Sequence, residues 1–239
     1  MTQQARDWLA QARRVCVLTG AGISAESGVP TFRGSGGLWR EFRAEDLATP
    51  GAFERDPKLV WEWYDWRRGV VSAARPNAGH EALAEYERRR PDGFTLVTQN
   101  VDGLHERAGS RAVERLHGSL WRVRCTGCGR EVEDDRAPLP ELPPRCGECG
   151  AMLRPGVVWF GEMLPEAALE AAVAAASSCE VMLVVGTSAV VYPAASLAPL
   201  ARRAGARLIE VNVEETPASG LADVHLRGSA GVALPRILL

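Results

Sequence analysis

The stretch Gly20-Ala21-Gly22-Ile23-Ser24-Ala25-Glu26-Ser27-Gly28-Val29-Pro30-Thr31-Phe32-Arg33 directly follows an apolar run, Val15 to Thr19. The run predicts a buried strand. Gly20, Gly22 and Ala25 fit a G-x-G-x-x-G/A turn, in which small residues let backbone N–H groups approach a pyrophosphate. Such a turn usually has an acidic ribose ligand about twenty positions later, at the end of a second strand. Glu41 lies near that spacing but follows a loop, so ribose contacts are expected from elsewhere.

Strands and helices alternate along most of the 239 residues, which predicts an α/β fold with a Rossmann-like doubly wound parallel sheet. Further strands are expected at 94–98, 112–116, 157–160, 181–185, 207–211 and 223–226, and helices at 6–14, 165–177 and 194–204. An aromatic helical stretch and a charged, proline-rich stretch interrupt this pattern. We therefore expect a large domain from residues 1–38, 90–120 and 153–239, and a small domain from a helical module, 39–89, and a second module, 121–152.

The composition argues against nucleic-acid and membrane partners. The formal net charge of −2 gives no bulk attraction to nucleic acid or to anionic membranes. Residues 1–11 lack the apolar run of a signal peptide, and no apolar stretch is long enough to span a bilayer. We expect a cytoplasmic protein without nucleic-acid or membrane partners, and the oligomeric state stays open.

Four of the six cysteines form two C-x-x-C pairs separated by seventeen residues, Cys125 with Cys128 and Cys146 with Cys149. Each pair offers two thiolates, and two pairs complete a tetrahedron without an open position, which predicts one structural zinc ion in a zinc ribbon. Two redox-active dithiols are the alternative. Cys16 and Cys179 stand in apolar runs and are interpreted as small buried hydrophobic residues.

Polar residues follow the apolar strands, where an open α/β sheet binds its ligands. The motifs are GAGISAESGVPTFRG (20–34), TQNVDGLHERAG (98–109), LHGSL (116–120), the cysteine pairs, VVWFGE (157–162), GTS (186–188) and NVE (212–214). In this order, over nearly the whole chain, they resemble the sirtuin family of NAD-dependent protein deacylases. The resemblance implies a Rossmann-type large domain, with NAD in the cleft between it and the small domain.

The resemblance also implies which residues bind NAD. Gly20 to Ser24 would hold the pyrophosphate, while Ala25, Phe32 and Arg33 would surround the nicotinamide ribose. The implied contacts are Gly20, Ala21, Gly22, Ile23, Ser24, Ala25, Phe32, Arg33, Trp39, Gln99, Asn100, Val101, Asp102, Gly186, Thr187, Ser188, Asn212, Val213, Glu214 and Ala230.

His117 matches the catalytic base of the family, with Asn100 and Asp102 as further catalytic residues. A lone histidine is more often a hydrogen-bonded core residue, but His117 alone among four stands in a motif at a strand end. A neutral imidazole accepts a proton at cellular pH. In sirtuin-like chemistry the acyl-lysine oxygen attacks C1′ of the nicotinamide ribose, and the base then activates a ribose hydroxyl. Nicotinamide, free lysine and 2′-O-acyl-ADP-ribose leave, so NAD is a co-substrate.

Acylated lysine side chains of proteins are the implied substrates. The segment with Val158, Phe160, Gly161 and Glu162, together with 190–192, would hold the peptide as an added strand. Tyr64 and Arg67 are three residues apart on one helix face, a spacing that alone indicates ordinary packing. However, VWEWYDWRR (60–68) resembles the class III, bacterial-type segment whose Tyr-x-x-Arg pair binds the carboxylate of succinyl, malonyl or glutaryl lysine. Ala48 is consistent with a roomy acyl pocket.

The sequence therefore predicts an NAD-dependent desuccinylase and demalonylase with some deacetylase activity. Three alternatives stay open: a general deacetylase, a protein ADP-ribosyltransferase of the same fold, and a module that senses NAD without turnover.

Overall fold

The computed structural model describes residues 1–31, 38–39 and 42–239. Its main sheet has six parallel strands in the order β11-β10-β9-β1-β4-β5. The strands are β1 (Val15–Thr19), β4 (Phe94–Thr98), β5 (Val113–Arg115), β9 (Val181–Val185), β10 (Arg207–Asn212) and β11 (Val224–Arg227). The predicted doubly wound parallel sheet is confirmed.

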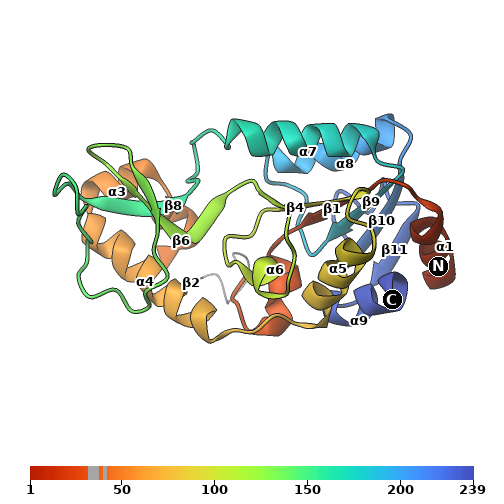
Figure 1. Ribbon diagram of the computed structural model, residues 1–239, viewed down its shortest axis with the longest axis horizontal. Coiled ribbons are helices and arrows are strands. Elements are labelled where there is room, and N and C mark those ends of the chain that lie inside the picture. Colours follow the sequence, from red (N-terminus) through yellow and green to blue (C-terminus); the bar gives the residue numbers. More distant parts are fainter. Residues whose placement is uncertain (32–37, 40–41) are drawn as a thin grey trace.

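Helices cover both faces of this sheet (Figure 1). One face carries α7 (Glu166–Ser178) and α8 (Leu197–Arg203), and the other carries α1 (Thr2–Gln11), α5 (Ala78–Arg89) and α9 (Ala230–Leu238). Alternate residues of β1 join the two cores: Val15 and Val17 face α1, α5 and α9, while Cys16 and Leu18 face α7 and α8. All five residues of β1 are buried, which explains its uninterrupted apolar sequence.

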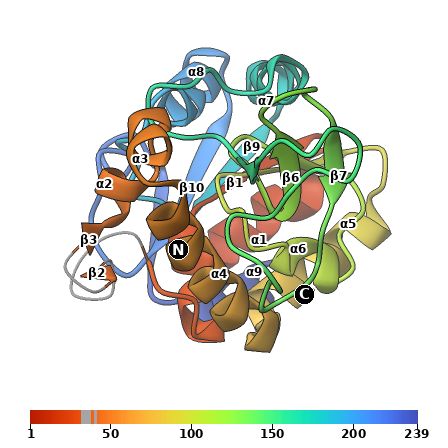
Figure 2. The same cartoon turned by 90° about the vertical axis from the view of Figure 1, so that its left-hand side faces the viewer.

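A second, antiparallel sheet has the order β7-β6-β8 and lies at the other end of the molecule, which Figure 2 views directly. Its strands are β6 (Gly118–Cys125), β7 (Glu131–Glu133) and β8 (Leu153–Val157), and α3 (Pro50–Arg55) and α4 (Pro57–Ala73) share its core. Helix α4 begins with Pro57 after the cap Asp56, whose carboxylate accepts the Leu59 N–H at 2.9 Å. Apolar residues of α4 complete this small core.

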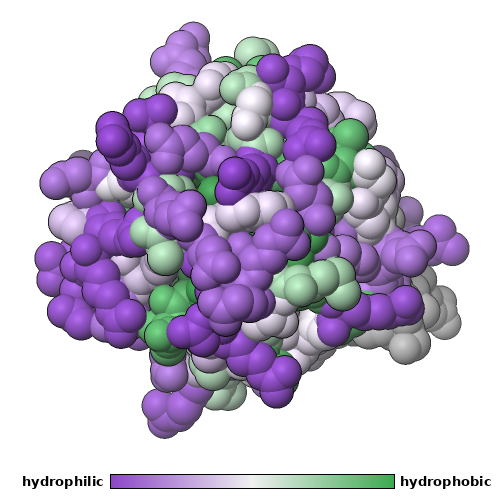
Figure 3. All heavy atoms as spheres, turned by 90° about the vertical axis from the view of Figure 1, so that its right-hand side faces the viewer, coloured by the Kyte–Doolittle hydropathy of each residue, from purple (hydrophilic) through white to green (hydrophobic). Residues whose placement is uncertain are grey.

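The remaining elements are short. They are η1 (Ala21–Ser27), the hairpin of β2 (Leu38–Trp39) and β3 (Phe42–Arg43), α2 (Ala44–Leu47), α6 (Leu104–Arg107) and η3 (Ala194–Ser196). The hairpin lies where the sequence predicts the start of the helical module, 39–89. None of the described helices is long and apolar enough to cross a membrane. Figure 3 shows the end of the molecule away from the small sheet, where hydrophilic residues predominate.

The predicted place of 157–160 in the parallel sheet is wrong. The strand ends at Val157, and β8 pairs antiparallel with β6 in the small sheet. A short apolar run indicates burial, but it does not indicate which sheet the strand joins. Helix α9 is also missing from the sequence prediction, because its nine residues contain Pro235 and follow a glycine-rich segment.

Helix α5 also differs from the prediction, which places it in the helical module of the small domain. Its buried residues Ala82, Leu83 and Tyr86 lie in the same core as Val15 and Leu96 of the large sheet. The amphipathic pattern that predicts the helix does not identify the surface on which it packs. The domain division as a whole stays a prediction.

Candidate active site

The turns after β1 and β9 pack backbone against backbone. Gly22 N donates to Gly186 O at 2.7 Å, and a Cβ atom on Gly22 would lie 2.8 Å from Gly186 Cα. Gly186 has φ +57°, and a Cβ atom there would lie 2.5 Å from Ile23 N. The contact therefore requires glycine at both positions. The close backbone contact between Gly22 and Gly186 explains the glycine-rich motif. It brings Gly20 to Ser24 beside Gly186 to Ser188.

A buried polar network joins the turn after β1 to the segment after β4. Ser24 Oγ donates to Asp102 Oδ2 at 2.8 Å, and Asn100 Nδ2 donates to Gly20 O at 3.1 Å. Burial raises the pKa of Asp102, while the Leu104 N–H and the Ser24 O–H act in the opposite direction. The structure thus brings Asn100 and Asp102, two of the expected NAD contacts and catalytic residues, beside Ser24 of the turn expected to hold the pyrophosphate.

His117 follows β5 and lies between the two sheets. Its Nδ1 is 2.9 Å from Gln99 O, and because a carbonyl oxygen only accepts, Nδ1 carries the proton and Nε2 keeps its lone pair. Burial lowers the pKa of His117, which favours the neutral ring. Gln99 in turn donates from Nε2 to Thr187 Oγ1 at 2.9 Å. His117 therefore has the tautomer and charge of a general base.

The loops after β10 and β11 complete the same sheet edge. Asn212 Nδ2 donates to Thr187 O at 2.9 Å, which links the NVE motif, with Val213 and Glu214, to the GTS motif. Glu26 accepts from Ser229 Oγ at 2.8 Å and from Gly231 N at 2.7 Å, which ties η1 to the first turn of α9 beside Ala230. Phe32 and Arg33 lie outside the described residues. Trp39 is placed only by its backbone, in β2, and its side chain lies outside the description.

Tyr64 is buried on α4, and Arg67, three residues later, is half-buried beside it. The Arg67 guanidinium carbon is 5.8 Å from the Tyr64 ring centroid, and Trp159 Nε1 donates to Tyr64 Oη at 3.0 Å. Burial raises the pKa of Tyr64 to about 12, so the phenol is neutral and keeps its proton. Burial lowers the pKa of Arg67, and the charges of Tyr64 and Asp102 oppose this effect. Guanidinium nevertheless stays charged in proteins.

The segment expected to pair with a peptide already uses most of its N–H groups. Val158 N donates to His117 O at 2.9 Å, and Phe160 N donates to Ala48 O at 2.9 Å. Trp159 N donates to Glu162 Oε2 at 2.8 Å, and Glu162 N donates to Trp159 O at 3.0 Å. A peptide lying here would therefore bond to carbonyl oxygens of the segment or to Gly161 N.

Sequence reasoning missed two buried histidines behind this network. His80 Nε2 is 3.4 Å from Ser24 Oγ, His105 Nε2 is 3.0 Å from Thr19 Oγ1, and the rings lie 4.9 Å apart. His80 also caps α5, because Asn77 N donates to its Nδ1. The N-x-x-H pattern at 77–80 is a local signal for such a cap. His105 has no comparable signal.

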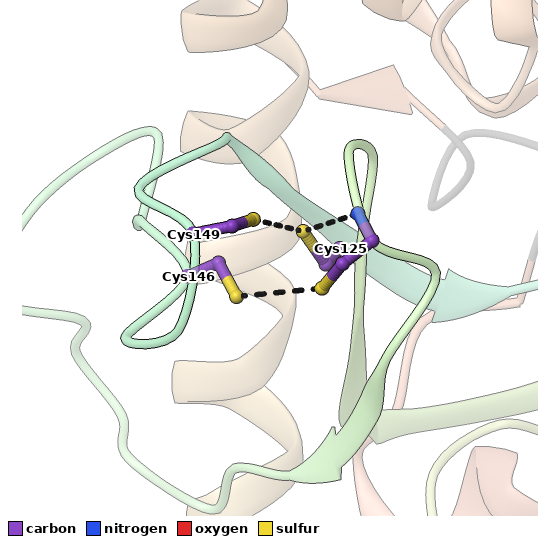
Figure 4. A group of neighbouring side chains, drawn as sticks. Cys125, Cys146 and Cys149 are labelled. Carbon is purple, nitrogen blue, oxygen red and sulfur yellow. Dashed lines mark hydrogen bonds between the residues drawn. The ribbon is translucent and has the colours of Figure 1, made fainter.

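The four predicted zinc ligands form one cluster (Figure 4). The sulfur atoms of Cys125, Cys128, Cys146 and Cys149 all lie within 4.8 Å of one another. Backbone N–H groups of Cys128 and Gly127 lower the pKa of the Cys125 thiol, which favours the thiolate that a metal requires. The four thiols fit a closed, structural zinc site.

Comparison with known proteins agrees with this geometry. The sequence pattern of the Sir2 family matches residues 20–193. A protein of Aquifex aeolicus (strain VF5) named NAD-dependent protein deacylase is 56% identical over 223 residues, which cover 93% of each chain. NAD-dependent protein deacylase 2 of Pyrobaculum aerophilum is 57% identical over 234 residues, covering 97% of this chain and 92% of the relative. A solved Sir2 homolog–NAD complex superposes with a TM-score of 0.93 at 49% identity, covering 99% and 92% of the two chains.

Proposed function

Because the chain belongs to the Sir2 family and is an NAD-dependent protein deacylase, we propose that it prefers lysine acyl groups that end in a carboxylate. Succinyl and malonyl groups are the preferred substrates in this proposal, and acetyl groups are removed more slowly. The observation that carries the proposal is the contact on α4 between the buried Tyr64 and the half-buried Arg67, whose guanidinium carbon lies 5.8 Å from the Tyr64 ring centroid. The products are free lysine, nicotinamide and 2′-O-acyl-ADP-ribose.

The residues of the sheet edge fit NAD. The close-packed turns at Gly22 and Gly186 would bind the pyrophosphate, and Asn100 and Asp102 would bind the nicotinamide ribose. NAD, when bound, supplies the electrophilic ribose carbon and the nicotinamide leaving group. His117 would accept the proton of a ribose hydroxyl at Nε2, since its Nδ1 proton is held by Gln99 O.

The acyl pocket combines a cation with a neutral donor. A guanidinium offers two parallel N–H groups to a carboxylate, and such charge-assisted bonds are stronger than neutral ones. Tyr64 keeps its proton at neutral pH and adds a third donor. The backbone oxygen of Ala48 accepts the Phe160 N–H, and the small side chain of Ala48 is consistent with a roomy acyl pocket.

The test is kcat/KM for one lysine peptide in succinylated and acetylated forms, at saturating NAD. A hydrogen bond to a charged group contributes about 1.5–3 kcal/mol, so we expect a succinyl preference of about ten- to a hundredfold that Arg67→Met abolishes. Lys58→Met removes an exposed cation from the same helix and serves as the matched control. Equal rates on both peptides, or an acetyl preference that Arg67→Met does not change, would identify a general deacetylase instead.

A further inference from the structure

The hydroxyl group of Tyr64 has a fixed hydrogen-bond direction. Trp159 Nε1 lies 3.0 Å from Tyr64 Oη, and the two residues are 3% and 1% exposed. An indole N–H is a donor only, so the phenol oxygen must accept from it. Its own O–H then remains to donate, and among the described residues no acceptor for it lies within hydrogen-bond distance.

The indole of Trp159 is itself held on several sides. The Arg154 guanidinium carbon lies 3.5 Å from its ring centroid, and the Phe53 ring packs at 5.3 Å. Arg154 binds both carboxylate oxygens of Glu162, at 2.6 and 2.8 Å, and Glu162 accepts the Trp159 backbone N–H. Turning the indole N–H away from Tyr64 would disrupt the ring contacts with Arg154 and Phe53.

We propose that Trp159 is a positioning residue that orients the Tyr64 hydroxyl in the acyl pocket. Its indole N–H occupies the acceptor position of Tyr64 Oη, so the Tyr64 O–H must donate toward the end of the acyl group. This inference rests on the proposed preference for acidic acyl groups. Arg67 supplies the positive charge, and the contact between Trp159 and Tyr64 supplies the direction of a second donor. An acyl group ending in hydrogen-bond acceptors is therefore favoured over one ending in a methyl group.

The test replaces Trp159 with phenylalanine and measures the ratio of kcat/KM for the succinylated and acetylated peptides, at saturating NAD. Removal of the N–H frees the Tyr64 hydroxyl to rotate, and the ratio falls about three- to tenfold, the range for one neutral hydrogen bond. Because phenylalanine also leaves space in the core, a second variant carries benzothienylalanine at position 159. This isostere of tryptophan has sulfur in place of N–H and must lower the ratio equally.

Trp61→Phe is the matched control. It removes another buried indole N–H, which donates to Leu153 O at 2.8 Å in the same core and is not bonded to Tyr64. This variant lowers the melting temperature and keeps the wild-type ratio. A double-mutant cycle supplies the second readout: in the Tyr64→Phe background, Trp159→Phe causes no further fall in the ratio.

The inference is overturned if both variants at position 159 keep the wild-type ratio, or if Trp159→Phe lowers the ratio equally with and without the Tyr64 hydroxyl. Failure of the underlying function gives a different result. If the wild type shows no succinyl preference and Arg67→Met changes nothing, both proposals fall. If Arg67→Met abolishes the preference while both position-159 variants retain it, only the role of Trp159 falls.

Discussion

Arg68 on α4 and Asp134, between the two cysteine pairs, form an ion pair in which the side chains are 1% and 5% exposed. Their closest atoms, Nη1 and Oδ1, are 3.5 Å apart, and Arg68 also donates to Arg136 O at 3.3 Å. Three residues earlier on the helix, Asp65 accepts the Leu139 N–H at 2.8 Å. The helix that carries Tyr64 and Arg67 is thus fastened to the zinc-binding segment by polar contacts as well as by apolar packing.

Removal of zinc should therefore unfold the small unit before it affects the chemical step. The closed four-thiolate site contributes folding free energy, and α4 loses its partners when residues 121–152 unfold. A chelator titration followed by circular dichroism, zinc release and deacylation should show that activity falls only after zinc is released and the fold of the small unit is lost. A chelated protein that keeps its fold and melting temperature but loses activity would contradict a structural role for the metal.

His117→Ala should bind NAD and lose turnover by about 10²–10⁴, the usual contribution of a general base. Burial lowers the pKa of His117 below its ordinary value of 6.5. The neutral base therefore persists into mildly acidic solution, and the acid limb of the kcat/KM profile of the wild type should lie below pH 6.5. NAD binding by calorimetry and a profile from pH 5 to 8 measure both effects. An acid limb centred above pH 7, or undiminished turnover by the variant, would show that another group is the base.

The buried histidines should make the fold sensitive to acid. Burial lowers the pKa of His80 to about 4 and that of His105 to about 3, from an ordinary value of 6.5. Between pH 6.5 and about 4 the unfolded chain binds more protons than the folded one, so the free energy of unfolding falls as the pH falls. One pKa unit corresponds to about 1.4 kcal/mol, and the two groups together therefore contribute several kcal/mol.

Denaturant unfolding at a series of pH values measures this slope. A His80→Asn, His105→Gln double variant should lose part of the dependence between pH 6.5 and 4.5, whereas zinc loss at low pH acts on both proteins alike. Parallel curves for the wild type and the double variant would mean that neither imidazole is kept neutral by the fold.

Gly22→Ala should destabilise the turn on which NAD is expected to bind. The added Cβ would lie 2.8 Å from Gly186 Cα and from Gly186 O. Such overpacking typically lowers the free energy of unfolding by about 1–3 kcal/mol. The free energy of unfolding and the NAD affinity should both fall. Gly220→Ala is the matched control, because nothing lies within 4 Å of its Cβ position and its φ is ordinary. Equal behaviour of the two variants would refute the close-packing argument.

Local signals predicted much of this structure. The strand at Val15–Thr19 and the cysteine pairs were found because the information lies within a few neighbouring residues. The pairing partner of β8 could not be predicted in this way. Its pairing with β6 depends on which strand edge is available after the chain has turned back. Trp159 and Tyr64 are 95 positions apart in the chain, and no local sequence pattern at either residue predicts their contact.

The same long separations have a consequence during synthesis on the ribosome. Trp61 on α4 finds its acceptor, Leu153 O, 92 residues later in the chain. At about 5–20 residues per second this interval lasts about 5 to 18 s. Until β8 has been made, the apolar side of α4 with Trp61 and Trp63 lacks one of the strands that cover it, although both side chains are almost fully buried in the folded protein. The nascent chain therefore exposes the apolar side of α4 before the zinc-binding segment is complete. A chaperone would bind the chain during this interval.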